Sequence, residues 1–136
     1  MSSIDIETAR QVLDAQPFSR LLGTRLADVS ATTVTLELDP REELLQQYGF
    51  VHGGVLAYLA DNALTYAGAL GLGPSVLTSG MTLDYVAPAR AEGVLRAVGT
   101  LVSSGRTKAT VRCDISQDDR LVATALGTVL ATRRDT

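Results

Sequence analysis

Cysteine and histidine are almost absent from this sequence: its 136 residues include one of each, Cys113 and His52. A single cysteine cannot form a disulfide within the chain, and this composition is typical of proteins in a reducing compartment. Protein metal sites need several cysteine, histidine or acidic ligands at short spacings, which this sequence does not offer. We therefore expect no metal site and a cytoplasmic location.

Long apolar runs and an excess of positive charge are also missing. No apolar run reaches the roughly 18 residues of a membrane span, because Asp61 and Asn62 interrupt the longest one. The first ten residues, MSSIDIETAR, carry acidic side chains and lack the apolar region of a secretory signal. The net charge of -3 provides no general attraction for nucleic acid or anionic lipid. We expect neither a membrane nor a nucleic-acid partner.

Sequence motifs for several common chemistries are missing as well. There is no G-x-G-x-x-G, no P-loop and no G-x-S-x-G, which are the motifs of dinucleotide binding, nucleotide-phosphate binding and the α/β-hydrolase nucleophile. Because the chain has one histidine, a Ser-His-Asp triad is not excluded by composition. However, no serine lies in a G-x-S-x-G turn that would expose it as a nucleophile. We expect no bound cofactor.

The overall composition is that of an ordinary globular protein. Apolar residues make up 46% of the chain and charged residues 20%. A chain of 136 residues is long enough to bury a core of its own. We expect one domain over residues 1–136.

The apolar stretch from Val55 to Leu70 organises this domain. It is rich in alanine and leucine and contains no proline, which favours a helix. Its apolar residues cover most of the helix circumference instead of forming one stripe, a pattern typical of a helix buried on nearly all sides.

Alternating apolar and polar residues predict strands on both sides of this helix. The expected elements are a helix over 4–15 that Pro17 ends, strands near 23–29, 33–39, 76–86, 94–103, 108–115 and 121–131, a polar turn or loop over 41–47, and hairpin connections at 104–106 and 117–120. They predict an α+β fold in which an antiparallel sheet of five to six strands wraps the central helix. Because one sheet cannot cover both sides of the helix, we expect a second copy of the chain on the far side.

One carboxylate, Asp61, lies inside the predicted buried helix. A buried carboxylate needs a partner, and burial raises its pKa. Thr65 stands one turn further along, on the same face. Two interpretations stay open: a structural aspartate satisfied by Asn62, Thr65 or a backbone group, or a functional carboxylate, since desolvated carboxylates cluster at active sites.

Two glycines, Gly53 and Gly54, follow His52 at the start of the helix and let another group approach the backbone closely. The first N–H groups of a helix lack internal partners and favour negative charge, so this end can act as an oxyanion hole. The alternative is a tight turn with a core histidine. Asp61 lies eight residues beyond Gly53, about 12 Å along a helix. One carbonyl cannot easily reach both groups in one chain, so we expect a site shared across a two-fold dimer.

These residues resemble a known family. His52-Gly53-Gly54 followed by Leu59-Ala60-Asp61-Asn62 is similar to the HGG…LAD signature of the PaaI-like acyl-CoA thioesterases, which have the hotdog fold. The resemblance extends from about Phe18 to Thr132 and includes the segment 83–89, LDYVAPA, and a Gly105-Arg106 turn. It implies a hotdog fold, an acyl-CoA substrate with no further cofactor, and assembly into dimers or dimers of dimers.

The resemblance also implies roles for residues around the helix start. Gln46 stands where the family has an asparagine that holds the thioester or the water, and its longer side chain shifts the amide. His52 shapes the loop and the helix start. A hydroxyl from Thr78 or Ser79 orients the water; we favour Ser79 because alternation places it with Leu77, Met81, Leu83 and Tyr85 on the helix-facing side.

The coenzyme A part of the substrate falls, in this family, near Arg90 and near the turn formed by Ser104, Gly105 and Arg106. Arginine makes forked contacts with phosphate, although a solvated surface arginine is the alternative interpretation. Gly54 belongs to the same substrate-binding group. Tyr48 and Tyr58 are expected in the core or in a pocket wall.

The leading hypothesis is hydrolysis of an acyl-CoA thioester. The Gly53 N–H and the Gln46 amide would bind the carbonyl oxygen, and Asp61 of the other subunit would act as general base or as nucleophile. Leucine, alanine, valine and tyrosine walls suit an aromatic or medium-length acyl group. The alternative is a non-catalytic acyl-CoA sensor with the same fold. Hydration of an enoyl thioester is disfavoured. The hotdog family with that activity has a histidine five residues after its aspartate, and here Tyr66 stands at that position.

Overall fold

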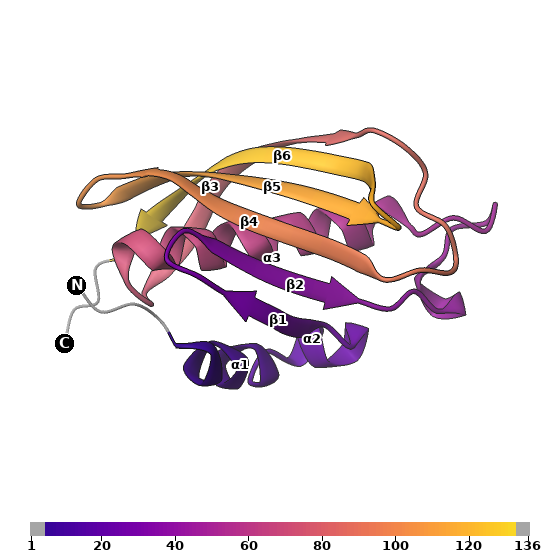
Figure 1. The fold of residues 1–136 in the computed structure, drawn as a ribbon, viewed down its shortest axis with the longest axis horizontal. Helices are drawn as coiled ribbons and strands as arrows, with labels where there is room; N and C mark the ends of the chain where they lie inside the picture. The colour runs from indigo at the N-terminus through magenta and orange to yellow at the C-terminus, as the bar shows by residue number, and fades with distance from the viewer. Residues whose placement is uncertain (1–4, 133–136) are drawn as a thin grey trace.

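The structure is a computed structural model that describes residues 5–132. Its six strands form one sheet in the order β1-β2-β4-β5-β6-β3, and every neighbouring pair is antiparallel. The strands are β1 (Arg25–Val29), β2 (Thr33–Leu38), β3 (Val76–Tyr85), β4 (Leu95–Ser104), β5 (Lys108–Gln117) and β6 (Arg120–Ala131). The long helix α3 (Gly53–Leu72) lies along one face of this sheet (Figure 1). The predicted α+β class, with six strands, is confirmed.

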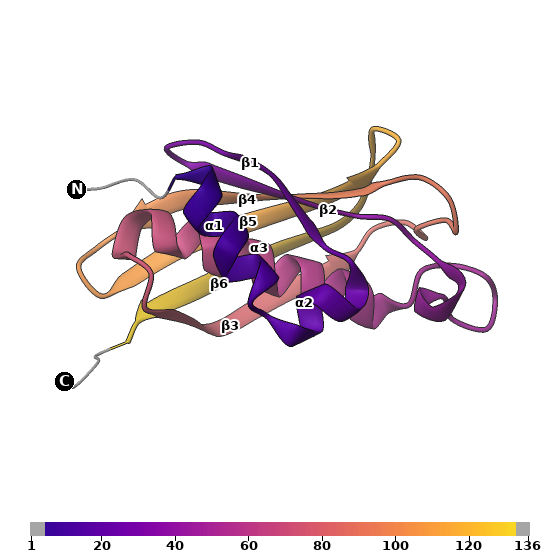
Figure 2. The same cartoon turned by 90° about the horizontal axis from the view of Figure 1, so that it is seen from below.

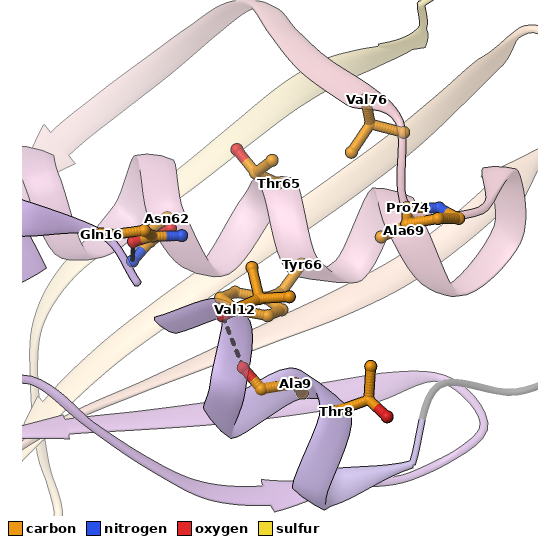
Figure 3. A pocket seen from close by; sticks show the side chains of 10 residues that line it. All are labelled: Thr8, Ala9, Val12, Gln16, Asn62, Thr65, Tyr66, Ala69, Pro74 and Val76. Carbon is orange, nitrogen blue, oxygen red and sulfur yellow. Dashed lines mark hydrogen bonds between the residues drawn. The ribbon is translucent and has the colours of Figure 1, made fainter. Parts of the chain in front are cut away.

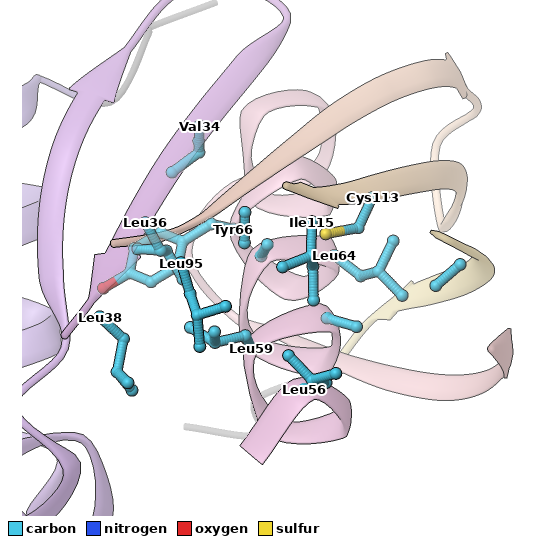
Figure 4. Packing of buried hydrophobic residues seen from close by; sticks show 14 of the residues in the cluster. Val34, Leu36, Leu38, Leu56, Leu59, Leu64, Tyr66, Leu95, Cys113 and Ile115 are labelled. Carbon is cyan, nitrogen blue, oxygen red and sulfur yellow. The ribbon is translucent and has the colours of Figure 1, made fainter. Parts of the chain in front are cut away.

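Helix α3 can lie close to the sheet because both surfaces have small residues where they meet. A Cβ added to Gly99 of β4 would collide with the carbonyl of Ala63, and one added to Gly68 would lie 2.5 Å from Val129 Cγ1. Around these contacts, leucine and isoleucine side chains from α3, β4 and β5 fill the core; Figure 4 shows Leu59, Leu64, Leu95 and Ile115 among them. This packing fixes the position of α3 on the sheet.

The far side of α3 is partly covered by helices of the same chain, so the argument that only a second copy could cover it was wrong. Helices α1 (Ile6–Asp14) and α2 (Pro17–Leu22) cross that side (Figure 2). The hydroxyl of Tyr66 on α3 donates to the carbonyl of Ala9 on α1 at 2.9 Å. Burial raises the pKa of Tyr66, so this hydroxyl remains a donor at ordinary pH. The cover is partial, and Gly54 and Asp61 stay exposed.

The N-terminal helix and the segment after it differ from the prediction. Helix α1 ends at Asp14, and Pro17 is the first residue of α2 instead of a simple stop. Proline fits the first position of a helix because the N–H it lacks has no partner there. Gly23 ends α2 with a φ of 79°, and β1 begins two residues later. The start of the predicted helix at residue 4 lies outside the described residues.

The polar segment before α3 contains one short 3-10 helix, η1 (Glu42–Leu44), as the predicted turn or loop allows. The hairpin at 104–106 is present between β4 and β5, where the Gly105 N–H donates to the carbonyl of Lys108. The second hairpin is shorter than predicted: β5 runs to Gln117, and only Asp118 and Asp119 form the turn, both with positive φ. No helix among the described residues is long and apolar enough to cross a membrane.

Candidate active site

Helix α3 begins with a side-chain cap. His52 precedes the helix with a φ of -60° and a ψ of 136°, and its Nδ1 accepts a hydrogen bond from the Gly54 N–H at 2.8 Å. An acceptor at this position satisfies one of the N–H groups that a helix start leaves without a partner. His52 therefore positions the helix start, and its accepting nitrogen carries no proton while this bond is made.

At this helix start, the backbone N–H of Gly53 remains without a hydrogen bond to the described part of the chain. It has no hydrogen-bond partner among the described residues, whereas the next two N–H groups bond to His52. Tyr85, at the end of β3, donates its hydroxyl to the Gly53 carbonyl at 3.0 Å. The Gly53–Gly54 peptide is thus held at both ends, by Tyr85 at its carbonyl and by His52 at its N–H.

Gly53 also has a steric reason to be glycine. A Cβ built on it would lie 3.2 Å from the Tyr85 Cζ and hydroxyl oxygen. Its φ is not in the left-handed region, so the close approach of the Tyr85 ring is what favours glycine. Sequence reasoning missed Tyr85, although the LDYVAPA segment contained it.

Gln46 lies beside this helix start. Gln46 and Gly53 both line a cavity of about 380 Å³, together with Phe50, Tyr85 and Ala89. The Gln46 Oε1 accepts hydrogen bonds from the backbone N–H groups of Tyr48 and Phe50. Since the oxygen is used in this way, the Gln46 NH₂ group is the end that remains to donate to a ligand.

The loop that closes this cavity, residues 86–94, is held by a side chain that the prediction assigned to a turn. Gln117 is 1% exposed, accepts from the Arg90 N–H at 2.7 Å, and donates to the carbonyls of Arg90 and Gly93 at 2.9 Å. The same loop accepts the Val51 N–H at the Ala89 carbonyl. Gln117 therefore ties the β5–β6 hairpin to the segment that leads into α3.

Asp61 is exposed in the single chain, so the expectation that α3 buries it was wrong. The helix turns this position outward, while Ala60 and Leu64 face the core. The Asp61 carboxylate makes no hydrogen bond or ion pair within residues 5–132. Whatever partner it has must come from outside the described part of the chain.

Thr65, one turn beyond Asp61 on α3, bonds to the backbone of that residue. Its Oγ1 donates to the Asp61 carbonyl at 2.8 Å and lies 2.7 Å from Thr78 Oγ1 on β3. This pair shows that the Asp61–Thr65 side of α3 is directed toward β3, the edge strand of the sheet.

Ser79 was assigned to the wrong face. The pairing of β3 with β6 shifts between Thr78 and Gly80, so Ser79 is an extra residue in a β-bulge. Before the bulge Thr78 faces the helix and Leu77 is 65% exposed; after it Met81 and Leu83 face the helix. The Ser79 hydroxyl donates to the Thr128 carbonyl at 3.3 Å. Simple alternation failed because a bulge reverses it.

The two predicted coenzyme A segments lie at opposite ends of α3. Arg90 stands at the Gly53 end and pairs with Asp118 at 3.9 Å. The 104–106 turn lies at the other end, where a Cβ on Gly71 would meet the Ser104 hydroxyl at 2.5 Å. Gly71 is 18 residues beyond Gly53, about 27 Å along the helix. One chain therefore does not bring these segments together.

The two tyrosines assigned to the core or pocket wall differ. Tyr48 is 77% exposed, so that assignment was wrong for the single chain. Tyr58 is half-buried, and its hydroxyl lies within hydrogen-bond distance of Ser19 and Thr24, at 2.6 and 2.7 Å. Asn62 donates to the same hydroxyl at 3.3 Å, so this polar cluster joins α2 to α3.

The arrangement has two parts with different chemistry. At the start of α3, a free N–H and an amide NH₂ line one cavity and can stabilise negative charge on an oxygen. Two turns along, Asp61 can accept a proton from water or attack a carbonyl carbon. Eight residues separate the parts, so within one chain they cannot act on the same carbonyl.

Known proteins match this chain along most of its length. A family model described as "Thioesterase superfamily" matches residues 48–124. A curated Deinococcus radiodurans protein named "Putative esterase" is 30% identical over 118 residues, which is 85% of this chain and 80% of that protein.

Solved structures agree in fold. A protein from the thioesterase superfamily is 34% identical with a TM-score of 0.86, covering 93% of this chain and 98% of that one. A variant of the phenylacetic acid degradation protein PaaI from Thermus thermophilus is 29% identical with a TM-score of 0.79, covering 86% and 100%. Escherichia coli PaaI is 22% identical with a TM-score of 0.84, covering 93% of this chain and 92% of that one. At this identity it supports the fold alone. The expected resemblance to PaaI-like hotdog proteins is confirmed.

Proposed function

This chain belongs to the thioesterase superfamily and is a thioester hydrolase, and we propose that its substrate is an acyl-CoA whose thioester is cleaved to a free acid and coenzyme A. The observation that carries the proposal is the free Gly53 N–H, which shares a cavity with the Gln46 amide. Two donors on residues that line one cavity are what a thioester carbonyl needs when negative charge develops on its oxygen.

Gly53 and Gln46 form the oxyanion-binding part of the proposed site. The Gly53 N–H points along the α3 axis from the helix start, where the helix dipole adds to the stabilisation of an anion. The Gln46 amide nitrogen supplies the second hydrogen bond, because its oxygen is occupied by the Tyr48 and Phe50 N–H groups.

Asp61 supplies the base or the nucleophile. As general base it takes a proton from a water molecule, whose oxygen attacks the thioester carbon and expels the coenzyme A thiolate, which is then protonated. As nucleophile it forms an acyl anhydride with loss of the same thiolate, and water then hydrolyses the anhydride. Both routes consume one water and release one acid and one thiol.

The active site is completed by a second copy of the chain, which pairs at β3. Strand β3 is ten residues long, pairs with β6 on one side only, and leaves Thr82 and Asp84 exposed. A long unpaired edge strand is a template for another strand. The opposite edge, β1, has five residues and packs against α1, so it is a poorer template.

A two-fold axis near the middle of β3 brings the two parts of the site together. The Tyr85 end of β3 touches Gly53, and the Thr78 end touches Thr65 beside Asp61. Antiparallel pairing of two β3 strands places the Tyr85 end of one beside the Thr78 end of the other. Each Gly53 then meets the Asp61 of the other chain, and the dimer has two equivalent sites.

The same dimer accounts for the two distant coenzyme A segments. Because the two α3 helices run antiparallel, the 104–106 turn of the chain that supplies Asp61 lies beyond the Gly53 start of its partner. Arg90 from one chain and Arg106 from the other can then contact phosphates at one mouth of the site.

The first test is turnover of an acyl-CoA panel, with release of coenzyme A followed by a thiol reagent. The panel contains acetyl, butyryl, octanoyl, palmitoyl, benzoyl and phenylacetyl thioesters. Asp61→Asn is expected to lower kcat by about 10³-fold with the dimer intact. Turnover that survives this change removes Asp61 from the chemistry, and tight coenzyme A binding without turnover favours the sensor alternative.

The shared site is tested by mixing two inactive variants. Asp61→Asn and Gly53→Pro are unfolded together and refolded, so that half of the dimers contain one chain of each kind. Each mixed dimer has one intact site, so the mixture recovers about a quarter of wild-type turnover if the sites are shared between chains. No recovery above the two separate variants contradicts the shared site.

A further inference from the structure

A second cavity lies on the side of α3 that faces away from the sheet, roofed by α1. Its volume is about 110 Å³. Figure 3 shows Ala9 and Val12 of α1 facing Tyr66 and Ala69 of α3 across it. Thr8, Gln16, Asn62, Thr65, Pro74 and Val76 complete the lining. Because sequence reasoning assigned the N-terminal helix no part in the site, this cavity was not anticipated.

The walls are mostly apolar, with the hydroxyls of Thr8 and Thr65 along the sides and two amides at one end. Gln16 and Asn62 mark one end and already bond to each other at 3.3 Å, while Pro74 and Val76 mark the other (Figure 3). Tyr66 turns its hydroxyl to the Ala9 carbonyl, so it presents its ring to the cavity. Within the described chain no buried polar side chain is left unsatisfied, so the cavity suits an apolar group without hydrogen-bonding needs.

The cavity is one side chain away from Asp61. Thr65 lines it and also donates its hydroxyl to the Asp61 carbonyl at 2.8 Å. On a helix Thr65 lies directly one turn beyond Asp61, while Ala69 lies one turn further in the same direction. An acyl group whose thioester carbon lies beside Asp61 can therefore enter this cavity at Thr65.

The volume limits which groups fit. An apolar cavity of about 150 Å³ accommodates one benzene molecule, and this cavity is slightly smaller but open at its mouth. Val12 lines the cavity and is 48% exposed, so it stands at that mouth. A single ring or a chain of a few carbons fits; a long chain would have to leave through the mouth into solvent.

We propose that the cavity between α1 and α3 is the acyl-group pocket of the site, and that it selects compact acyl groups, a single ring or a short chain, over long linear ones. The proposal rests on the hydrolytic function above and adds the class of acyl group. Val12 and Ala69 set the width of the pocket, so they are specificity-determining residues that take no part in the chemical step.

Selectivity between acyl groups tests the assignment. We expect wild type to hydrolyse phenylacetyl-CoA or butyryl-CoA with at least tenfold higher kcat/KM than palmitoyl-CoA. Val12→Phe should lower kcat/KM for phenylacetyl-CoA by roughly tenfold or more, and by much less for acetyl-CoA, because the added ring occupies the pocket. Val102→Phe, at a valine that is 52% exposed on β4, is the matched control and should change neither.

Binding separates failure of the pocket from failure of the hydrolytic function. A non-hydrolysable thioether analogue of phenylacetyl-CoA is titrated calorimetrically into wild type, Val12→Phe and Val102→Phe. If selectivity and analogue affinity are the same in Val12→Phe as in wild type, the pocket is overturned. If turnover in that case still depends on Asp61, the hydrolytic proposal is supported on its own. If wild type hydrolyses no thioester, the hydrolytic proposal is overturned. If the analogue in that case still binds wild type and Val102→Phe but not Val12→Phe, the pocket is supported.

Discussion

The two ends of the proposed site, both on α3, are built in opposite ways. At the helix start, Gly53 is surrounded by its own chain: His52 caps the helix, Tyr85 holds the Gly53 carbonyl, and Gln117 anchors the loop that closes the cavity. Two turns along, Asp61 is exposed and its carboxylate has no partner within the described residues.

This difference separates what one chain completes from what it leaves to an assembly. Donors for an oxyanion must stay fixed while charge develops, since their advantage comes from preorganisation. The helix start meets that requirement alone. A carboxylate must be desolvated to act as a strong base, and the single chain leaves Asp61 in water. The second chain in the proposed dimer supplies that burial.

After Asp61→Asn, whose effect is given above, the largest effect should come from removing the donor at the fixed end. Gly53→Pro deletes the N–H at the first helical position, where proline is tolerated, and the His52 ψ of 136° suits a following proline. We expect kcat to fall by about 10²–10³-fold. Gly53→Ala is the control, because it adds the same Cβ toward Tyr85 and keeps the N–H. Equal losses in the two variants would mean that crowding, not the donor, matters.

A smaller effect should follow from loosening the same end. Tyr85→Phe keeps the ring against Gly53 and removes the hydrogen bond to its carbonyl. One such bond contributes about 1 kcal/mol, so we expect kcat to fall roughly fivefold with KM nearly unchanged. Steady-state kinetics on the best substrate measures both constants. A rise in KM with kcat unchanged would show that Tyr85 serves substrate binding and not the oxyanion donor.

The open end should respond more weakly to a comparable change. Thr65→Val is nearly isosteric and removes the hydroxyl that links the Asp61 carbonyl to Thr78. We expect a two- to fivefold loss of kcat, since the Asp61 carboxylate itself is not held by this hydroxyl. Thr65→Ser, which keeps a hydroxyl, should retain most of the wild-type kcat. A loss as large as that of Asp61→Asn would instead place the Thr65 hydroxyl on the reacting water.

The smallest effect concerns the core beneath both ends. Burial raises the pKa of the Cys113 thiol from its ordinary 9.0 to about 12, so the folded protein should not react with a thiol reagent at pH 8. Because the folded-state pKa is the higher one, the stability from the buried neutral thiol is present below pH 9 and is lost between pH 9 and 12. Denaturant titrations at pH 8 and pH 10 measure this loss, with Cys113→Ala as the control that lacks it. Rapid labelling of native protein at pH 8 would contradict the burial.

Sequence reasoning located the elements well and failed where local rules were broken by contacts between elements. The extents of α3 and of the strands followed from composition and alternation. Ser79 was misplaced because a β-bulge adds one residue, and the signal for it, Gly80 inside the strand, was overlooked. Gln117 was assigned to a turn because polar residues usually lie there, but three hydrogen bonds to the 90–93 backbone make its burial favourable.

The sequence by itself determined the α+β class, the long apolar helix and the family, because these depend on periodicity and on a short motif read along one chain. Only the tertiary structure decided which hydroxyl faces α3, that Tyr85 holds the Gly53 peptide, and that α1 roofs a cavity beside Asp61. These facts depend on which segments, distant in sequence, come to lie within a few ångströms of each other. Packing of the whole chain sets those distances, and local residue preferences do not specify them.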